Sequence, residues 1–221
     1  QQAEPINRVE KKALGTQYYG GFYKWKDHLF VPSWGGSLFE ALMPTLCLDE
    51  KGLSPDSLGK NNTEHAKIHA EYALDELKYP VWGMSPSSVP EGGYSEYGVA
   101  ILGSKGYKPG VVTPHVTGLA VNFIPEEAIS NFRNLIERYD IYGEYGFYDA
   151  VTVETKLVAY KYLSLDQGML FGGLVNYLTN GSLIKYFMQD PIAQKAKVVL
   201  TEEKLFDPPY VPPKPKVKKA V

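Results

Sequence analysis

The sequence predicts a mostly helical protein whose helices follow one another in hairpin pairs. Three observations lead to this prediction. Apolar residues recur at helical spacing in several separate segments of the 221-residue chain. Most of these segments begin or end at a proline, a glycine or a capping residue. Long glycine-rich stretches separate the segments, which favours a functional site built from loops at one end of the helices.

The N-terminal residues precede the first helical pattern. Residues 15–26 are rich in tyrosine and glycine, and they fit either a strand or a flexible aromatic loop. We therefore treat residues 1–30 as an aromatic, glycine-containing segment that joins a main α-helical domain of residues 31–200.

Two helices and a long loop are expected in the first half of that domain. One helix begins near Gly36 and is bent or ended by Pro44. Another covers residues 61–77, where an Asn-Asn-Thr-Glu run suggests an N-terminal cap. Residues 82–110 are rich in glycine and proline and predict an irregular segment. Loops of this length are usually functional or disordered, and the aromatic residues here argue against disorder.

Helices also dominate the expectations for the second half. Residues 113–123 form a helix that Thr113 and Pro114 open, and residues 125–139 form a second helix with two acids in its first turn. Residues 150–160 alternate enough for a short strand or hairpin. Three further helices are expected at the end of the domain: from 163–166 to Leu178, around 182–188, and after Pro191.

The bulk composition excludes some functions. A net charge of −2 gives no electrostatic basis for binding nucleic acid, and the absence of any run of 18 apolar residues excludes a membrane span. Cys47 is the only cysteine, so neither an intrachain disulfide nor a cysteine-based zinc site can form, and its apolar neighbours predict a buried, unreactive thiol. Residues 206–221 form a proline- and lysine-rich tail of extended character.

Two acids lie within aromatic and apolar runs. Asp149 follows Gly-Phe-Tyr, and Asp166 precedes Gln167 and a glycine. A carboxylate among rings is costly to bury, so it is usually hydrogen-bonded or functional. Rings stack on the C–H faces of a sugar while carboxylates bind its hydroxyls and transfer protons. The combination therefore indicates a carbohydrate site.

Several motifs together resemble the C-terminal part of the bacterial glucoamylase-like family. The matching runs are S-W-G-G-S-L-F-E-A-L-M-P (33–44), V-W-G-M-S-P-S-S…P-E-G-G-Y-S-E-Y-G (81–98), G-V-V-T-P-H (110–115), G-F-Y-D-A-V (146–151) and Y-L-S-L-D-Q-G-M (162–169). The family is similar to β-1,2-glucan-processing glycoside hydrolases and to a domain of cyclic β-1,2-glucan synthases. The resemblance implies a bacterial enzyme of carbohydrate metabolism, either periplasmic or secreted, with its signal peptide outside this chain.

The resemblance also implies an (α/α)6 toroid of helical hairpins with the site in its central hollow. Twelve helices of about 10–14 residues need well over 221 residues. We therefore expect about half of the toroid here, with the missing half on a second polypeptide, removed or outside this chain. A second departure concerns the acid that some relatives carry after the W-G-x-S run. Pro86 takes that position, and the nearest acid is Glu91.

Three acids are predicted to be catalytic, because glycoside hydrolysis uses a proton donor and a base or nucleophile. Asp149 is the first choice for the base or nucleophile, although it could instead cap a turn or bind a sugar hydroxyl. Glu91 is the first choice for the proton donor, because its glycine loop could close over a substrate; a solvated loop acid is the alternative. Glu96 lies between two tyrosines whose contacts could favour its protonated form.

The remaining motif residues are predicted to bind substrate, each against a structural alternative. Asp166 could cap a helix instead, Glu40 could pair with a buried polar group, and His115 could be a structural histidine. The aromatic residues could belong to the core. The predicted substrate-binding set is Trp34, Glu40, Trp82, Tyr94, Tyr97, His115, Tyr148, Asp166 and Gln167.

The sequence thus predicts a glycoside hydrolase or transglycosylase that acts on a glucan without a metal or another cofactor. His65 and His69 are four residues apart, but no H-E-x-x-H pattern accompanies them. The alternative is a non-catalytic carbohydrate-binding or scaffolding module derived from the same fold. The choice between α-glucan and β-1,2-glucan stays open at this point.

Overall fold

An antiparallel sheet opens the chain in the computed structural model, which describes residues 3–13 and 15–207. Strands β1 (Glu4–Ala13), β2 (Thr16–Trp25) and β3 (His28–Phe30) pair in that order. The strand interpretation of residues 15–26 is confirmed, whereas β1 was not predicted. The sheet is fastened to a helix of the main domain, because the His28 ring contacts Glu64 at 2.6 Å and Glu71 at 2.9 Å.

The first helices follow the sheet. Helix α1 (Leu38–Leu42) starts at a capping box in which Ser37 and Glu40 bond to each other's backbone, and it tightens into a 3-10 turn at Met43–Leu46, which contains Pro44. Helix α2 (Glu50–Leu53) is short, and α3 (Leu58–Glu71) continues as a π-helical turn to Glu76. The cap predicted at 61–63 is wrong, because these residues lie inside α3.

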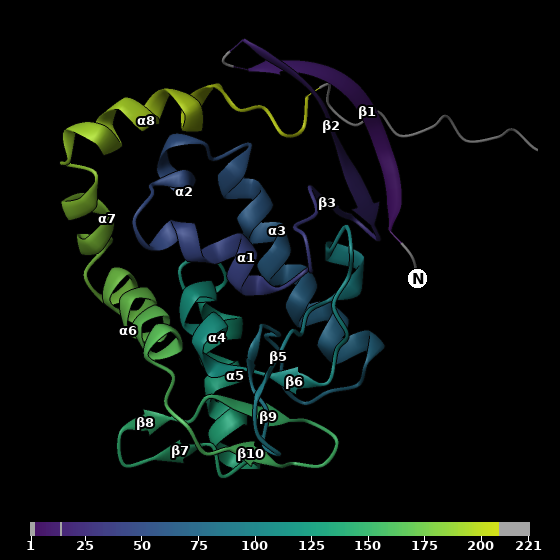
Figure 1. The fold of residues 1–221 in the computed structure, drawn as a ribbon, viewed down its shortest axis with the longest axis vertical. Coiled ribbons are helices and arrows are strands. Elements are labelled where there is room, and N and C mark those ends of the chain that lie inside the picture. Colours follow the sequence, from purple (N-terminus) through teal and green to yellow (C-terminus); the bar gives the residue numbers. More distant parts are fainter. Residues whose placement is uncertain (1–2, 14, 208–221) are drawn as a thin grey trace, which may run out of the picture.

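Helix α4 (Pro114–Ala120) forms the centre of the core, and all seven of its residues are buried. Helices α5 (Pro125–Arg138) and α6 (Ser164–Leu178) pack against it, and α7 (Ser182–Phe187) and α8 (Pro191–Glu202) follow along one edge of the molecule (Figure 1). These five helices match the predicted segments closely. Most of the chain's regular structure is therefore helical, as predicted.

Short strands gather at the opposite end of the molecule from the β1–β2 ribbon (Figure 1). They form two hairpins and a three-stranded sheet of order β10-β9-β6. The strands are β4 (Ser87–Ser88), β5 (Tyr94–Ser95), β6 (Val111–Val112), β7 (Tyr142–Gly143), β8 (Gly146–Phe147), β9 (Ala150–Thr152) and β10 (Val158–Ala159). The hairpin expected within 150–160 is confirmed, and the segment 82–110 is mostly irregular, as predicted.

Of the predicted tail, 208–221 lie outside the described residues, and the proposed domain boundaries stay predictions. Within the described part of the chain, no helix combines the length and the apolar character that crossing a membrane requires.

Candidate active site

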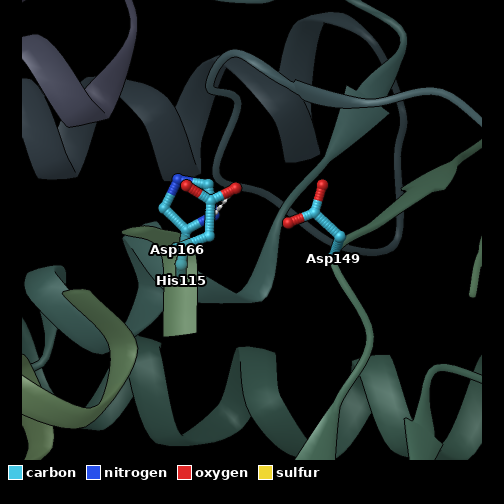
Figure 2. A group of neighbouring side chains, drawn as sticks. All are labelled: His115, Asp149 and Asp166. Atoms are coloured by element: carbon cyan, nitrogen blue, oxygen red, sulfur yellow. Dashed lines mark ion pairs between the residues drawn. The ribbon is translucent and has the colours of Figure 1, made fainter. Parts of the chain in front are cut away.

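Three titratable side chains meet at the end of the molecule where the short strands gather. His115, Asp149 and Asp166 each offer an oxygen or nitrogen atom, and these atoms lie within 4.8 Å of one another. All three side chains are buried, and Asp149 is only 1% exposed. Figure 2 shows the Asp149 carboxylate pointing toward Asp166 and His115.

A close approach of two helices places two members of this cluster. His115 contacts Asp166, and farther along the helices Gly118 lies against Leu170 and Gly173. The two helices α4 and α6 therefore run in the same direction, with both N-termini at the cluster. A Cβ on Gly173 would collide with the carbonyl oxygen of Gly118, so glycine is required for this spacing.

The third member, Asp149, reaches the cluster from the loop before β9. Its Oδ2 accepts a hydrogen bond of 2.7 Å from the backbone N–H of Ser88 in β4. Its own N–H donates to the Lys161 carbonyl oxygen at 3.0 Å. The second carboxylate oxygen, Oδ1, has no hydrogen-bond partner among the described residues. Asp149 is thus held by two backbone contacts, and its second oxygen is buried without a partner among the described residues.

The environment pushes two of the three groups toward their neutral forms. Burial, followed by a hydrogen bond and charge repulsion from Asp149, raises the pKa of Asp166 from 3.8 to about 8. Burial lowers the pKa of His115 to about 4. At pH 7 the contact of 3.6 Å between His115 Nδ1 and Asp166 Oδ2, dashed in Figure 2, therefore joins two neutral groups.

This arrangement can hold and move a proton. The raised pKa keeps a proton on Asp166 near pH 7, and Asp149 lies beside it. The two carboxyl groups are nevertheless close, with an oxygen of each within 4.8 Å of the other. The carboxyl groups of glycosidases that face each other across a sugar bond lie about 5–5.5 Å or about 6.5–9.5 Å apart. Asp149 and Asp166 are therefore too close to face each other across a sugar bond, and both fit the same side of such a bond.

The same cluster is the group of described residues that could hold a metal ion. One histidine and two carboxylates suit a divalent cation, and His115 Nδ1, Asp149 Oδ1 and Asp166 Oδ2 have no hydrogen-bond partner in the described part of the chain. Asp166 would first have to lose a tightly held proton. The expectation of no metal and no cofactor stays a prediction. His65 and His69 instead hydrogen-bond to backbone carbonyl oxygens of Val31 and Gly36.

The other predicted acids lie outside the cluster. Glu91 is exposed at the turn of the β4–β5 hairpin, and Glu96 is exposed and accepts a hydrogen bond from Tyr107. Glu40 accepts bonds from Gly35 N and Ser33 Oγ and completes the α1 cap, which is the structural alternative considered for it. The alternative for Asp166 is wrong, because the residue is inside α6 and makes no capping bond.

The predicted aromatic residues divide between surface and core. Trp34 and Tyr94 are exposed. Partial burial of its hydroxyl, followed by the charges of Asp166 and Asp149, raises the pKa of Tyr94, which places this hydroxyl near the cluster. Trp82 is only 2% exposed and Tyr97 is buried, and both belong to the core, so neither presents a face to a sugar. For Trp82 and Tyr97 the structure therefore favours the alternative, a place in the core, over the predicted role of a surface on which a sugar stacks.

The last two predicted residues lie next to the cluster. Gln167 follows Asp166 and donates a hydrogen bond of 3.1 Å to the Phe147 carbonyl oxygen. Tyr148 precedes Asp149, is partly buried and contacts two other tyrosine rings. The structure therefore brings both residues to the site, while their roles in binding substrate stay predictions.

A group of tyrosines beside the cluster was missed by the sequence analysis. Four exposed tyrosines join the predicted Tyr148, and the five lie on β7, on either side of β8 and in the loop before α6. We call them the tyrosine surface, and they are Tyr142, Tyr145, Tyr148, Tyr160 and Tyr162. The available signal was the high tyrosine content of the chain, 17 residues, together with the repeated tyrosines on both sides of β9 and β10.

Comparison with known proteins gives a consistent family. The family model Glycoamylase, described as putative glucoamylase, matches residues 8–191. The chain is 28% identical over 197 residues to the cyclic β-(1,2)-glucan synthase NdvB of Rhizobium meliloti (strain 1021). The aligned region covers 81% of this chain and 7% of that protein.

Similar solved structures agree with this family assignment. An endo-β-1,2-glucanase from Chitinophaga pinensis, solved with sophorotriose and glucose, has a TM-score of 0.64 and 28% identity over 88% of this chain and 46% of its own. A glucoamylase homologue from Bacteroides uniformis has a TM-score of 0.62 and 28% identity, covering 75% of this chain and 40% of its own. This chain thus spans less than half the length of these relatives.

Proposed function

Because this chain belongs to the Glycoamylase family, we propose that it forms part of the active site of a glycoside hydrolase that acts on a β-1,2-linked glucan. The choice of β-1,2-linkage rests on the similarity to an endo-β-1,2-glucanase and to a cyclic β-1,2-glucan synthase. An α-glucan, which the family name suggests, is the competing substrate.

The observation that carries the proposal is the Asp149–Asp166 pair. A buried carboxyl group whose pKa is raised, next to a second carboxyl group, is typical of acid–base sites. In the proposed mechanism, Asp149 acts as the base or nucleophile, because its Oδ1 has no hydrogen-bond partner among the described residues. Asp166 remains protonated, donates a hydrogen bond to Asp149 and fixes the orientation of the carboxylate. His115 packs against Asp166 from α4 and helps to keep it buried.

The proton donor belongs on the other side of the sugar bond. Glu91 remains the candidate within this chain, because it occupies the turn of the hairpin whose Ser88 is bonded to Asp149. A bound glucan would draw this turn over the cluster and bring Glu91 toward the leaving oxygen. If the acceptor of the cleaved sugar is a glucan hydroxyl rather than water, the same residues perform transglycosylation, and product analysis distinguishes the two outcomes.

The surface of α6 supports a further part of the proposal, that this chain supplies about half of an (α/α)6 toroid. Apart from the buried Asp166, α6 contains no charged residue. One face packs on α4, and the opposite face carries an apolar row that we call the α6 stripe, in which Leu165, Gly168, Phe171 and Leu178 are exposed and Val175 is half-buried. A helix that is apolar on all sides is normally buried.

The length of the relatives suggests what covers this stripe. More than half of the residues of the Chitinophaga pinensis enzyme have no counterpart in this chain. Helices equivalent to that unmatched part, in a longer form of this protein or on a second polypeptide, would bury the α6 stripe and complete the wall of the site.

A substitution at Asp149 tests the proposed function. The release of reducing ends from β-1,2-glucan and from an α-1,4-glucan is measured for the wild-type chain, for Asp149→Asn and for Glu202→Gln. Glu202 is an exposed acid at the end of α8, outside the cluster and the tyrosine surface, and provides the matched control. We expect Asp149→Asn to lower turnover of β-1,2-glucan by at least about 100-fold while binding persists, and Glu202→Gln to leave turnover unchanged.

The alternative is a non-catalytic carbohydrate-binding module. It is favoured by one observation, namely that the buried acids of this chain occupy only one side of a glycoside site. A wild-type chain that binds glucan without cleaving it, and whose binding is unchanged in Asp149→Asn, would establish this alternative. The predicted periplasmic or secreted location stays a separate proposal.

A further inference from the structure

We propose that the tyrosine surface is a binding subsite for β-1,2-linked glucose units adjacent to Asp149. The identity of the sugar rests on the proposed function, whereas the existence of the subsite rests on the geometry of the tyrosines. The proposal adds four residues, Tyr142, Tyr145, Tyr160 and Tyr162, to the site.

Four of the five rings form a continuous series of contacts. Tyr145 meets Tyr162 edge-to-face at 5.8 Å, Tyr162 meets Tyr148 at 5.0 Å, and Tyr148 meets Tyr160 edge-to-face at 4.9 Å, measured between ring centroids. Contacts of this kind restrict the rings before any ligand arrives. A restricted aromatic surface loses little conformational entropy on binding, which favours affinity.

The rings nevertheless remain accessible. Tyr145 is 74% exposed, and Tyr142 and Tyr160 are more than half exposed. Each ring can therefore present part of a face or an edge to the C–H groups of a pyranose. Their hydroxyls can also bind sugar hydroxyls, a combination that leucine or phenylalanine cannot offer.

The hydroxyls are held in defined positions. The Tyr160 hydroxyl donates to Asp140 at 3.1 Å, and the Tyr162 hydroxyl accepts from the Tyr145 N–H at 3.4 Å. The hydroxyls of Tyr148 and Tyr162 lie directly over Gly143, where a Cβ would be 2.8 Å from the Tyr162 oxygen and closer to the Tyr148 oxygen. Gly143 thus makes room for two polar atoms that face the same space.

The surface is physically continuous with the candidate active site. Tyr148 immediately precedes Asp149, and the Asp149 N–H bonds to the carbonyl of Lys161, which lies between Tyr160 and Tyr162. This backbone hydrogen bond therefore joins the segment that contains Tyr148 and Asp149 to the segment that contains Tyr160 and Tyr162. A glucan that lies along the tyrosines would have a glucose unit close to Asp149.

This chemistry favours a sugar over an apolar protein segment. Every member of the surface carries a hydroxyl, and the charged side chains of Asp140, Glu144 and Lys161 are exposed around it. Such a surface would leave many polar groups unsatisfied beneath an apolar partner, at a cost in free energy. A carbohydrate satisfies them with its own hydroxyls.

Binding of sophorotriose to the 221-residue chain tests the proposal. The dissociation constant is measured by NMR titration for the wild type, Tyr145→Ala and Tyr162→Ala. Tyr186→Ala is the matched control, because Tyr186 is 81% exposed on α7, outside the series. We expect each of the two surface variants to weaken binding about tenfold, equivalent to about 1.4 kcal/mol, with no change in the control.

A conservative variant separates the ring from the hydroxyl. Tyr162→Phe keeps the stacking face and should lose less affinity than Tyr162→Ala. Thermal unfolding confirms that each variant is folded, and Tyr145, which is largely exposed, provides a position where folding is not at risk. The proposal is overturned if the wild type does not bind sophorotriose, or if Tyr145→Ala binds it as tightly as the wild type does.

The same variants show whether the subsite proposal or the hydrolase proposal fails. If Asp149→Asn abolishes glucan hydrolysis while Tyr145→Ala and Tyr162→Ala keep the wild-type dissociation constant, the hydrolase stands and the subsite fails. If the tyrosine variants lose binding but no form of the chain cleaves glucan, the subsite stands and the hydrolase fails.

Discussion

The tyrosine surface and the α6 stripe are both exposed and both rich in large side chains, yet they differ in chemistry. The tyrosines carry hydroxyls, contact one another and border a buried pair of acids. The α6 stripe presents Leu165, Phe171 and Leu178, which offer no polar atom, and Phe171 and Leu178 are 70% and 78% exposed. Exposure alone therefore does not identify a ligand site; the polar atoms within a surface indicate what can cover it.

The comparison also separates the partners that we propose. A sugar needs both C–H stacking and hydrogen bonds, whereas a packed helix needs apolar contact and excludes water. The first surface should therefore respond to oligosaccharides and the second to other polypeptide surfaces.

The largest expected effect is on association through the α6 stripe. The isolated wild-type chain should self-associate and bind a hydrophobic dye, because its uncovered apolar row lacks the helices proposed to bury it. The double variant Phe171→Lys/Leu178→Lys should weaken self-association by about 100-fold, since the two most exposed apolar side chains of the stripe are replaced by charges. Sedimentation measurements over a range of concentrations provide the check.

The matched control for this experiment lies on the other surface. Tyr145→Lys should leave self-association unchanged, because the tyrosine surface is proposed to bind sugar. A wild-type chain that stays monomeric and binds no dye would contradict the interpretation of the α6 stripe as an uncovered interface.

The second expected effect concerns the buried face of α6, opposite the stripe. Gly173→Ala should destabilise the fold by about 1–3 kcal/mol, because the new methyl group collides with the Gly118 carbonyl in a packed interior. A protein of this size loses about 2–4 °C in Tm for each kcal/mol, which thermal unfolding detects. An unchanged Tm would show that α4 and α6 are not in close contact.

The third effect is a dependence of stability on pH at the acid cluster. The raised pKa of Asp166 means that the folded chain keeps a proton that the unfolded chain releases above pH about 4. Stability from this group is therefore lost as the pH rises toward 8. The lowered pKa of His115 acts in the opposite direction, but only below about pH 6.5. Between pH 6.5 and 8 His28 adds a decline of its own, because its hydrogen bond to Glu64 raises its pKa above 6.5, so the Asp166 effect has to be obtained by comparison with a variant.

The variant Asp166→Asn isolates this effect. Asparagine mimics the protonated carboxyl, so the decline of Tm between pH 6.5 and 8 should become smaller than in the wild type, by about 2–4 °C for each kcal/mol involved. Self-association through the α6 stripe should show no such dependence, because none of its five residues titrates. Equal pH profiles for wild type and Asp166→Asn would rule out a protonated Asp166.

The smallest effect is expected at Gly168, on the exposed stripe. Its Cβ would meet no atom within 4 Å, so Gly168→Ala should stabilise the isolated chain by about 0.5–1 kcal/mol through helix propensity. Gly168→Ala is expected to stabilise the fold and Gly173→Ala to destabilise it, and this difference distinguishes the two faces of α6. A loss of stability in Gly168→Ala would indicate that the stripe is already covered.

Local sequence patterns were sufficient for most of the helices. The segments of α4, α5, α6, α7 and α8 have periodic apolar residues and clear start signals, and these signals act over a few residues. Strand β1 was missed because a strand depends on its partner in the sheet. The cap predicted at 61–63 failed because Asn61 and Asn62 bond to other segments instead, through contacts with Val31 and Glu50.

The sequence by itself determined the helical class, the family and the acids and aromatic residues worth testing. Only the tertiary structure decided which of them meet. His115 and Asp166 come together because Gly118 and Gly173 let α4 and α6 approach closely, whereas backbone bonds to Ser88 and Lys161 bring Asp149 to them. Trp82 enters the core while Trp34 stays exposed. Helix formation depends on neighbours along the chain, whereas burial and proton affinity depend on atoms brought together from distant segments.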